Sequence, residues 1–126
     1  MAPATRLQQV LRLIREKLVG MDCAIKIEKH NIVENTEYLR LTIACENKFM
    51  IHIREYVKAN RIIRYSYQLL INSEDVLRYD NAPHHPEIRT HPHHKHKKTK
   101  TYPLHNPSLK AFLEEVLGTI TSVDPP

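Results

Sequence analysis

The chain has 126 residues, a formal net charge of +5 and two cysteines. This length is typical of one domain that can bury a core without disulfide bonds. Its pI near 9.3 favours a polyanionic partner such as nucleic acid or an acidic protein. No apolar run approaches the roughly 20 residues of a membrane span and no signal-peptide pattern is present, so we expect a cytoplasmic single domain over residues 1–126 without membrane contact.

The first predicted element is an amphipathic helix near the N-terminus. Its apolar residues recur at helical spacing, and Gly20 suits a left-handed stop after the last of them. They are Leu7, Val10, Leu11, Ile14 and Leu18. Because only one side of this helix is apolar, we expect it to pack on an apolar surface.

Between Asp22 and Asp80 the hydrophobic period changes to two. Short polar turns separate the alternating runs, which is typical of an antiparallel meander of four or five strands. The runs are Ile25–Ile27, Leu39–Cys45, Phe49–Ile53, Ile63–Ile71 and a shorter Val76–Asp80. We interpret Cys23 and Cys45 as small core residues rather than as a disulfide framework.

The C-terminal part is predicted to be helical again. Asn106 can cap this helix and Pro107 suits its first position, while Gly118 and the terminal prolines mark its end. The apolar stripe runs from Leu109 to Ile120. The predicted fold is therefore α+β, with the N- and C-terminal helices packed on one face of the sheet.

The other face of the predicted sheet carries the polar positions of the strands. These positions include Lys26, Glu28, Arg40, Thr42, His52, Arg54, Arg64 and Ser66. Arginines on three successive strands could form a platform for a phosphate backbone. The alternative interpretation is a solvated face that its charge keeps soluble.

The connection at 81–105, predicted as one long loop, concentrates the chemistry of the chain. Six of the nine histidines lie between His84 and His96, among prolines and before a lysine run. RNA cleavage without metal needs a base, an acid and a cation near the phosphate. The candidates for these catalytic roles are His84, His85, His93, His94, His96, Asp80 and Lys95. The candidates for nucleic-acid binding are Arg40, Arg54, Arg64, Arg89, Lys97 and Lys98.

Two other interpretations of this segment stay open. Clustered imidazoles suit Zn²⁺ and similar ions, and the alternative ligands are His91, His93, His94 and His96. Their spacing matches neither a helical zinc pair nor a zinc finger. The third interpretation is a flexible cationic loop that acts only through its charge.

Two blocks in this region carry a family resemblance. They are Arg78-Tyr79-Asp80-Asn81-Ala82-Pro83-His84-His85 and Pro92-His93-His94-Lys95-His96. They resemble the paired motifs of the TumE-type toxins of prokaryotic toxin–antitoxin gene pairs, and a looser resemblance extends from Ala24 to Ile120. The positions carried over are Asp80, Asn81, His84, His85, His93, His94, Lys95 and His96. His91 departs from the apolar or aromatic residue expected there, and the run Lys97–Lys100 is unusually basic.

The resemblance implies a cytoplasmic toxin that a cognate antitoxin neutralises, and nuclease activity is a class-level analogy. Our leading hypothesis is an RNA-directed endoribonuclease without a cofactor, with RNA and the antitoxin as partners. His85 and His94 would be its acid/base pair, Asp80 would orient a histidine, and Lys95 with Arg54 would contact phosphate. The alternatives are a non-catalytic nucleic-acid-binding module and a metalloprotein with histidine ligands.

Overall fold

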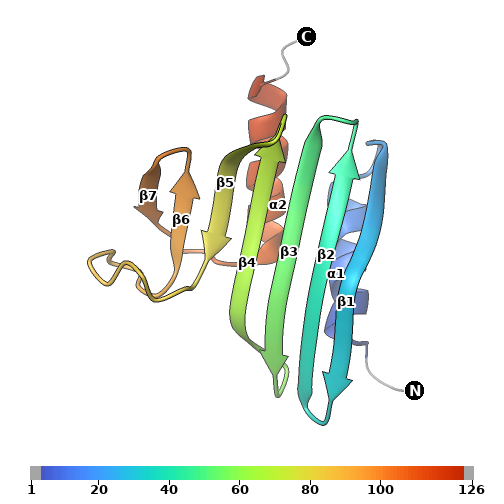
Figure 1. Cartoon of the computed structure of the whole chain (residues 1–126), viewed down its shortest axis with the longest axis vertical. Coiled ribbons are helices and arrows are strands. Elements are labelled where there is room, and N and C mark those ends of the chain that lie inside the picture. Colours follow the sequence, from blue (N-terminus) through green and yellow to red (C-terminus); the bar gives the residue numbers. More distant parts are fainter. Residues whose placement is uncertain (1–3, 124–126) are drawn as a thin grey trace.

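The structure is a computed structural model that describes residues 4–123. Its helices are α1 (Arg6–Lys17) and α2 (Leu109–Val123). Its strands are β1 (Cys23–Val33), β2 (Thr36–Cys45), β3 (Phe49–Lys58), β4 (Arg61–Ile71), β5 (Glu74–Asp80), β6 (His94–Lys97) and β7 (Lys100–Pro103). All neighbouring strands are antiparallel and their spatial order is their chain order, which confirms the predicted α+β meander (Figure 1).

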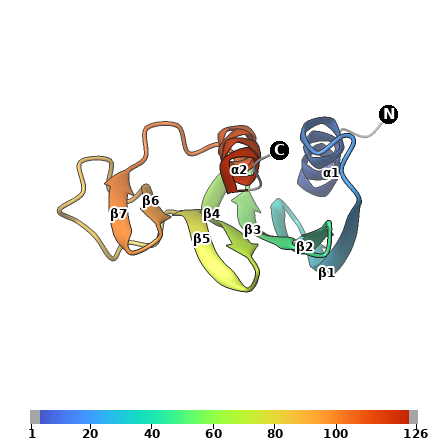
Figure 2. The same ribbon diagram turned by 90° about the horizontal axis from the view of Figure 1, so that it is seen from above.

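Both helices lie on the same side of the sheet, as predicted (Figure 2). Strand residues in one phase of the two-residue alternation point toward the helices and are buried with them. This core includes Leu41, Ile53, Tyr67 and Leu77 from the strands, with Ile14 and Phe112 from the helices. The opposite face of the sheet, which we call the open face, is left without a covering layer.

Local hydrogen bonds set the ends of the two helices. Thr5 and Gln8 form a reciprocal capping box at the start of α1, which satisfies two otherwise unpaired donors. Gly20, with φ of 87°, follows the end of α1 as predicted. For α2 the predicted cap is wrong: the Ser108 hydroxyl accepts from the Ala111 backbone N–H, and the helix continues through Gly118 to Val123.

The prediction of four or five strands is wrong, because the sheet has seven. The two additional strands, β6 and β7, lie within the 81–105 segment that was predicted as a loop. Their residues are mainly histidine, lysine and threonine, so they lack the apolar alternation that reveals a strand in a sequence. What makes them strands is pairing with the edge of β5, in the register Asp80 with His94 and Arg78 with His96.

The cysteines belong to the core or pack against it, as predicted, but the interpretation that they form no disulfide bond is wrong. Cys23 and Cys45 are direct partners in the β1–β2 register, and a disulfide bond joins them. The two cysteines are 22 residues apart in the chain, so their pairing depends on the register of β1 against β2. Within residues 4–123, no helix is long and apolar enough to cross a membrane.

Candidate active site

The strand register arranges the polar residues of the open face in rows across the sheet. One row runs through Arg40, Arg54, Ser66, Asp80 and His94 on β2 to β6. The neighbouring row places His52, Gln68, Arg78 and His96 side by side on β3 to β6. In both rows the positions on β5 and β6 are ionisable, and the candidate site lies there.

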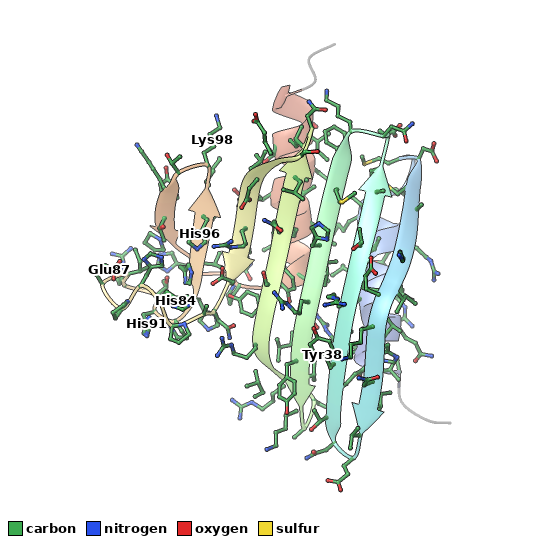
Figure 3. The ribbon with its side chains drawn as sticks, viewed as in Figure 1. Tyr38, His84, Glu87, His91, His96 and Lys98 are labelled. Atoms are coloured by element: carbon green, nitrogen blue, oxygen red, sulfur yellow. A yellow bond between two sulfur atoms is a disulfide. The ribbon has the colours of Figure 1, made fainter. Side chains whose placement is uncertain are left out.

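A pocket of about 540 Å³ opens on this face over β2 to β6 and the segment after β5. Three arginines line it, Arg54, Arg64 and Arg78, each from a different strand. It is also lined by Tyr38 and Tyr56, by Asp80, and by the histidines His84, His85, His94 and His96. Figure 3 looks onto the open face and shows Tyr38 on β2, His96 on β6 and His84 on the loop between β5 and β6.

Asp80 and His94 form the buried floor of the pocket. The His94 Nε2 atom lies 2.8 Å from the Asp80 Oδ1 atom, with side chains 2% and 10% exposed. The His94 Nδ1 atom lies 2.9 Å from the Pro92 carbonyl oxygen. Both ring nitrogens therefore face acceptors, and each can donate a hydrogen bond when it carries a proton. The other Asp80 oxygen accepts from Arg78 Nε at 2.9 Å.

His96 lies beside this pair but is bonded differently. Its Nδ1 atom contacts the Thr101 hydroxyl at 3.4 Å. Its Nε2 atom is buried without a hydrogen-bond partner among the described residues, and is 3.7 Å from Asp80 Oδ2. Burial lowers the pKa of His96, and the Arg78 guanidinium lowers it further against the opposing effect of Asp80. Both effects favour the neutral ring, in which one nitrogen carries a lone pair.

His85 covers the other two imidazoles from the loop. Its ring centroid lies 5.1 Å from that of His94 and 5.6 Å from that of His96, and the latter two are 4.7 Å apart. Its Nδ1 atom lies 3.1 Å from Glu87 Oε1. One ring nitrogen from each of these three residues lies within 4.8 Å of the others, so the group we call the histidine cluster (His85, His94, His96) could hold a metal ion.

The arginines of the open face have an unusual environment. Arg40 and Arg54 are directly opposite each other on β2 and β3, a like-charge pairing that weakens a sheet. Within the described residues, Arg40, Arg54 and Arg64 have no carboxylate at ion-pair distance. Beside them, Tyr38 and Tyr56 are cross-strand partners, and Tyr56 is 38% exposed. This surface offers unneutralised positive charge next to accessible aromatic rings.

Alternation within β6 sends Lys95 to the opposite face from His94 and His96. Its ammonium group lies 3.2 Å from Glu115 of α2, and it faces the ring of Tyr79. His93 also lies outside the pocket lining: its Nδ1 atom bonds the Tyr65 hydroxyl at 2.9 Å and the two rings stack. Burial, and then the charge of His94, lower the pKa of His93.

The other predicted residues fall into two groups. Asn81 continues the sheet after β5, since its amide bonds the Tyr65 N–H and the Ile63 carbonyl. His91, Arg89, Lys97 and Lys98 do not line the pocket, and Arg89 contacts His105. Lys98 projects from the far end of the β6–β7 hairpin, away from His84 and His91 (Figure 3).

Several site residues escaped the sequence analysis. Arg78 was detectable in principle, because it shares the phase of Asp80 two residues later. Tyr38 and Tyr56 share the phase of Arg40 and Arg54, but aromatic residues in strands are more often part of the core. Glu87 and Thr101 carried no signal, because their contacts with histidines depend on the loop and on β7.

A protein-family model described as Toxin TumE matches residues 4–123, which is almost the whole chain and includes every residue of the pocket. No curated protein and no solved structure matches the chain.

Proposed function

We propose, from the premise that this chain belongs to the TumE toxin family, that it acts as an RNA-directed endoribonuclease. Family membership makes it a toxin of a toxin–antitoxin pair, with a cognate antitoxin as its partner. The nuclease proposal is carried by one observation: arginines from three strands and four histidines line the same pocket on the open face.

The arginines support binding of a phosphate backbone. Arg54 and Arg64 line the pocket and have no carboxylate partner among the described residues, so their charge is available to a ligand. Guanidinium groups bind phosphate oxygens in a bidentate manner. Arg40, opposite Arg54 in the adjacent strand, extends this positive surface toward β1. With the scissile phosphate bound at Arg54, the neighbouring phosphates of the RNA would lie over Arg40 and Arg64.

The tyrosines favour single-stranded RNA over a duplex. Bases that are unpaired can stack on aromatic side chains, at about 1–3 kcal/mol per base. Tyr38 and Tyr56 lie beside the arginines on the same open face and line the same pocket. One side of the Tyr38 ring already faces the Lys29 ammonium at 5.6 Å, which adds positive charge close to the stacking surface.

The reaction needs a group that accepts the 2′-hydroxyl proton and a group that protonates the leaving 5′-oxygen. We assign proton donation to His84, which is exposed and lines the pocket. We assign the proton acceptor to the histidine cluster at the pocket floor. Lys95 has no role in this proposal, because it lies on the helix-facing side with Glu115.

The test is cleavage of labelled single-stranded RNA by the purified chain. We expect cleavage by the parent and by His105→Ala, in which an exposed histidine outside the pocket is removed, but not by His84→Ala or His85→Ala. RNA that is bound tightly and never cleaved by the folded parent would reject the nuclease and favour the non-catalytic binding module. In cells, the same two pocket variants should relieve the growth arrest caused by the parent.

A further inference from the structure

The histidine cluster has an arrangement that simple burial of polar residues does not require. In each ring the Nδ1 atom has a separate partner: Glu87 Oε1 for His85, the Pro92 carbonyl for His94 and the Thr101 hydroxyl for His96. One ring nitrogen of each residue lies within 4.8 Å of the others, and the His94 Nε2 atom also faces Asp80 Oδ1 at 2.8 Å. Metal-binding histidines in proteins are held in this way, by a second hydrogen bond that fixes the tautomer and the ring orientation.

An unsatisfied atom lies at the centre of this arrangement. The Nε2 atom of His96 is buried and has no hydrogen-bond partner among the described residues. Buried polar atoms are nearly always paired, so such an exception calls for an explanation, and an ion is one of the usual ones. A cation bound at this point would satisfy His96 together with the other two rings.

The structure assigns to His85, His94 and His96 a site for one divalent transition-metal ion of the Zn²⁺ class. Three imidazole ligands suit this class of ion rather than Mg²⁺ or Ca²⁺, which prefer oxygen. Metal–nitrogen bonds of about 2.0–2.1 Å in tetrahedral geometry set the ligand atoms about 3.4 Å apart. The three nitrogens already lie within 4.8 Å of one another, so a small movement of the His85 loop completes the site.

The charges around the cluster are compatible with a cation. Asp80 lies against His94, with facing atoms 2.8 Å apart, so the carboxylate places negative charge beside an ion bound by the cluster. Glu87 supplies a second carboxylate through His85. Arg78 opposes the ion, but its Nε atom is bonded to Asp80. Three protein ligands leave a fourth position open to water or substrate, as in catalytic rather than structural zinc sites.

This inference deepens the proposed function, on which its catalytic meaning rests, by naming a cofactor for the same pocket. A metal-bound water is far more acidic than free water, so a bound ion would give the cluster a hydroxide at neutral pH. That hydroxide would accept the 2′-hydroxyl proton and become water, while His84 would give a proton to the leaving 5′-oxygen. The 2′-oxygen would form a bond to phosphorus as the bond from phosphorus to the 5′-oxygen breaks, which leaves a 2′,3′-cyclic phosphate and a 5′-hydroxyl, as in cleavage by imidazole alone.

The test is metal titration of the full chain after treatment with a chelator and dialysis. Co²⁺ is the probe, because its visible absorption reports the ligand set. We expect binding of one equivalent per chain, with displacement by one equivalent of Zn²⁺. His85→Ala and His96→Ala should weaken binding on the order of 100-fold or more, and Thr101→Val about 10–100-fold. His91→Ala and His105→Ala, which remove histidines outside the cluster, should bind like the parent.

Circular dichroism and thermal melting would establish that each variant is folded. If a cluster variant does not fold, Glu87→Gln decides instead, because Glu87 is an exposed loop residue whose loss should still weaken binding. Less than one equivalent bound by the parent, or unchanged binding in the folded variants, would overturn the inference. Cleavage of RNA by metal-free protein would reject the catalytic role of the metal and keep the nuclease, whereas stoichiometric metal without cleavage would keep the metal site and reject the nuclease.

Discussion

Replacement of the arginines on the open face tests the RNA-binding surface most directly. The variants are Arg54→Gln, Arg64→Gln and the double variant, which remove charges that have no carboxylate partner within residues 4–123. Each phosphate contact with single-stranded nucleic acid contributes about 0.7 to the slope of log affinity against log salt concentration. We therefore expect each single variant to reduce that slope by about 0.7 and the double variant by about 1.4.

The fold supplies a second, independent readout for Arg54. Because Arg54 is directly opposite Arg40 in the β2–β3 register, the two charges repel each other in the free protein. Arg54→Gln should therefore raise the free energy of unfolding by a few tenths of a kcal/mol while it weakens RNA binding. A residue with only a structural role would change stability in the opposite direction. Chemical denaturation measures this effect without any RNA.

Fluorescence anisotropy with a labelled single-stranded RNA, at salt concentrations spanning a tenfold range, measures the slope. Arg12→Gln and Arg15→Gln are the matched controls, because they remove exposed arginines of α1 on the other side of the sheet. An unchanged slope in the double variant, or an equal loss in the α1 controls, would refute the assignment of RNA to the open face. The second result would mean that only the net charge matters.

Three further predictions concern single side chains. Asp80→Asn should lower the free energy of unfolding of the metal-free chain by about 2–4 kcal/mol, because it leaves the buried His94 without its carboxylate. Urea denaturation would measure this change. A decrease below about 0.5 kcal/mol would contradict a charged pair of Asp80 and His94. Lys95→Met should leave RNA cleavage per folded molecule unchanged and lower the melting temperature, since Lys95 contacts Glu115. A large loss of cleavage without loss of stability would mean that Lys95 takes part in the reaction. Burial alone would raise the pKa of Glu37, but hydrogen bonds from His30 and from the Leu7 and Arg6 N–H groups outweigh it and hold the pKa below its usual value of 4.5. Glu37→Gln should therefore lower the free energy of unfolding by about 1–2 kcal/mol at pH 7. Because the stabilising effect of a carboxylate with a lowered pKa is lost as pH falls, the denaturation curves of parent and variant should converge in acid. A difference in unfolding free energy that is the same at pH 7 and pH 3 would exclude this explanation.

The parts of the fold that could be predicted from the sequence are those whose signal is local. The alternation in β2 to β4 and the helical stripe before Gly20 each reflect one buried face, which repeats within a few residues. This alternation also placed Arg40, Arg54 and Arg64 correctly on the uncovered face. The order His-His-Lys-His likewise marked a segment from which two residues, His94 and His96, line the pocket, because local composition was enough to single it out.

What escaped prediction depends on pairing between distant segments. Strands β6 and β7 form because β6 pairs with the edge of β5. The composition of His94–Lys97 lacks the apolar alternation that predicts a strand. Without this strand, the alternation that separates Lys95 from His94 and His96 could not be seen, so all three were assigned to one site. The Cys23–Cys45 disulfide bond likewise follows from the register of two strands.

The position of the β6–β7 hairpin has a consequence for how the site behaves in solution. The hairpin consists of two four-residue strands at the edge of the sheet, and its backbone is joined to the larger sheet through the pairing of β6 with β5. Short edge strands open locally at much lower cost than central ones such as β2 to β4. The backbone amides that hold His94 and His96 should therefore exchange with solvent long before those of the core. The two histidines would therefore lie on strands that open more readily than the core. A ligand that binds both of them would reduce this local opening and slow amide exchange in β6 and β7.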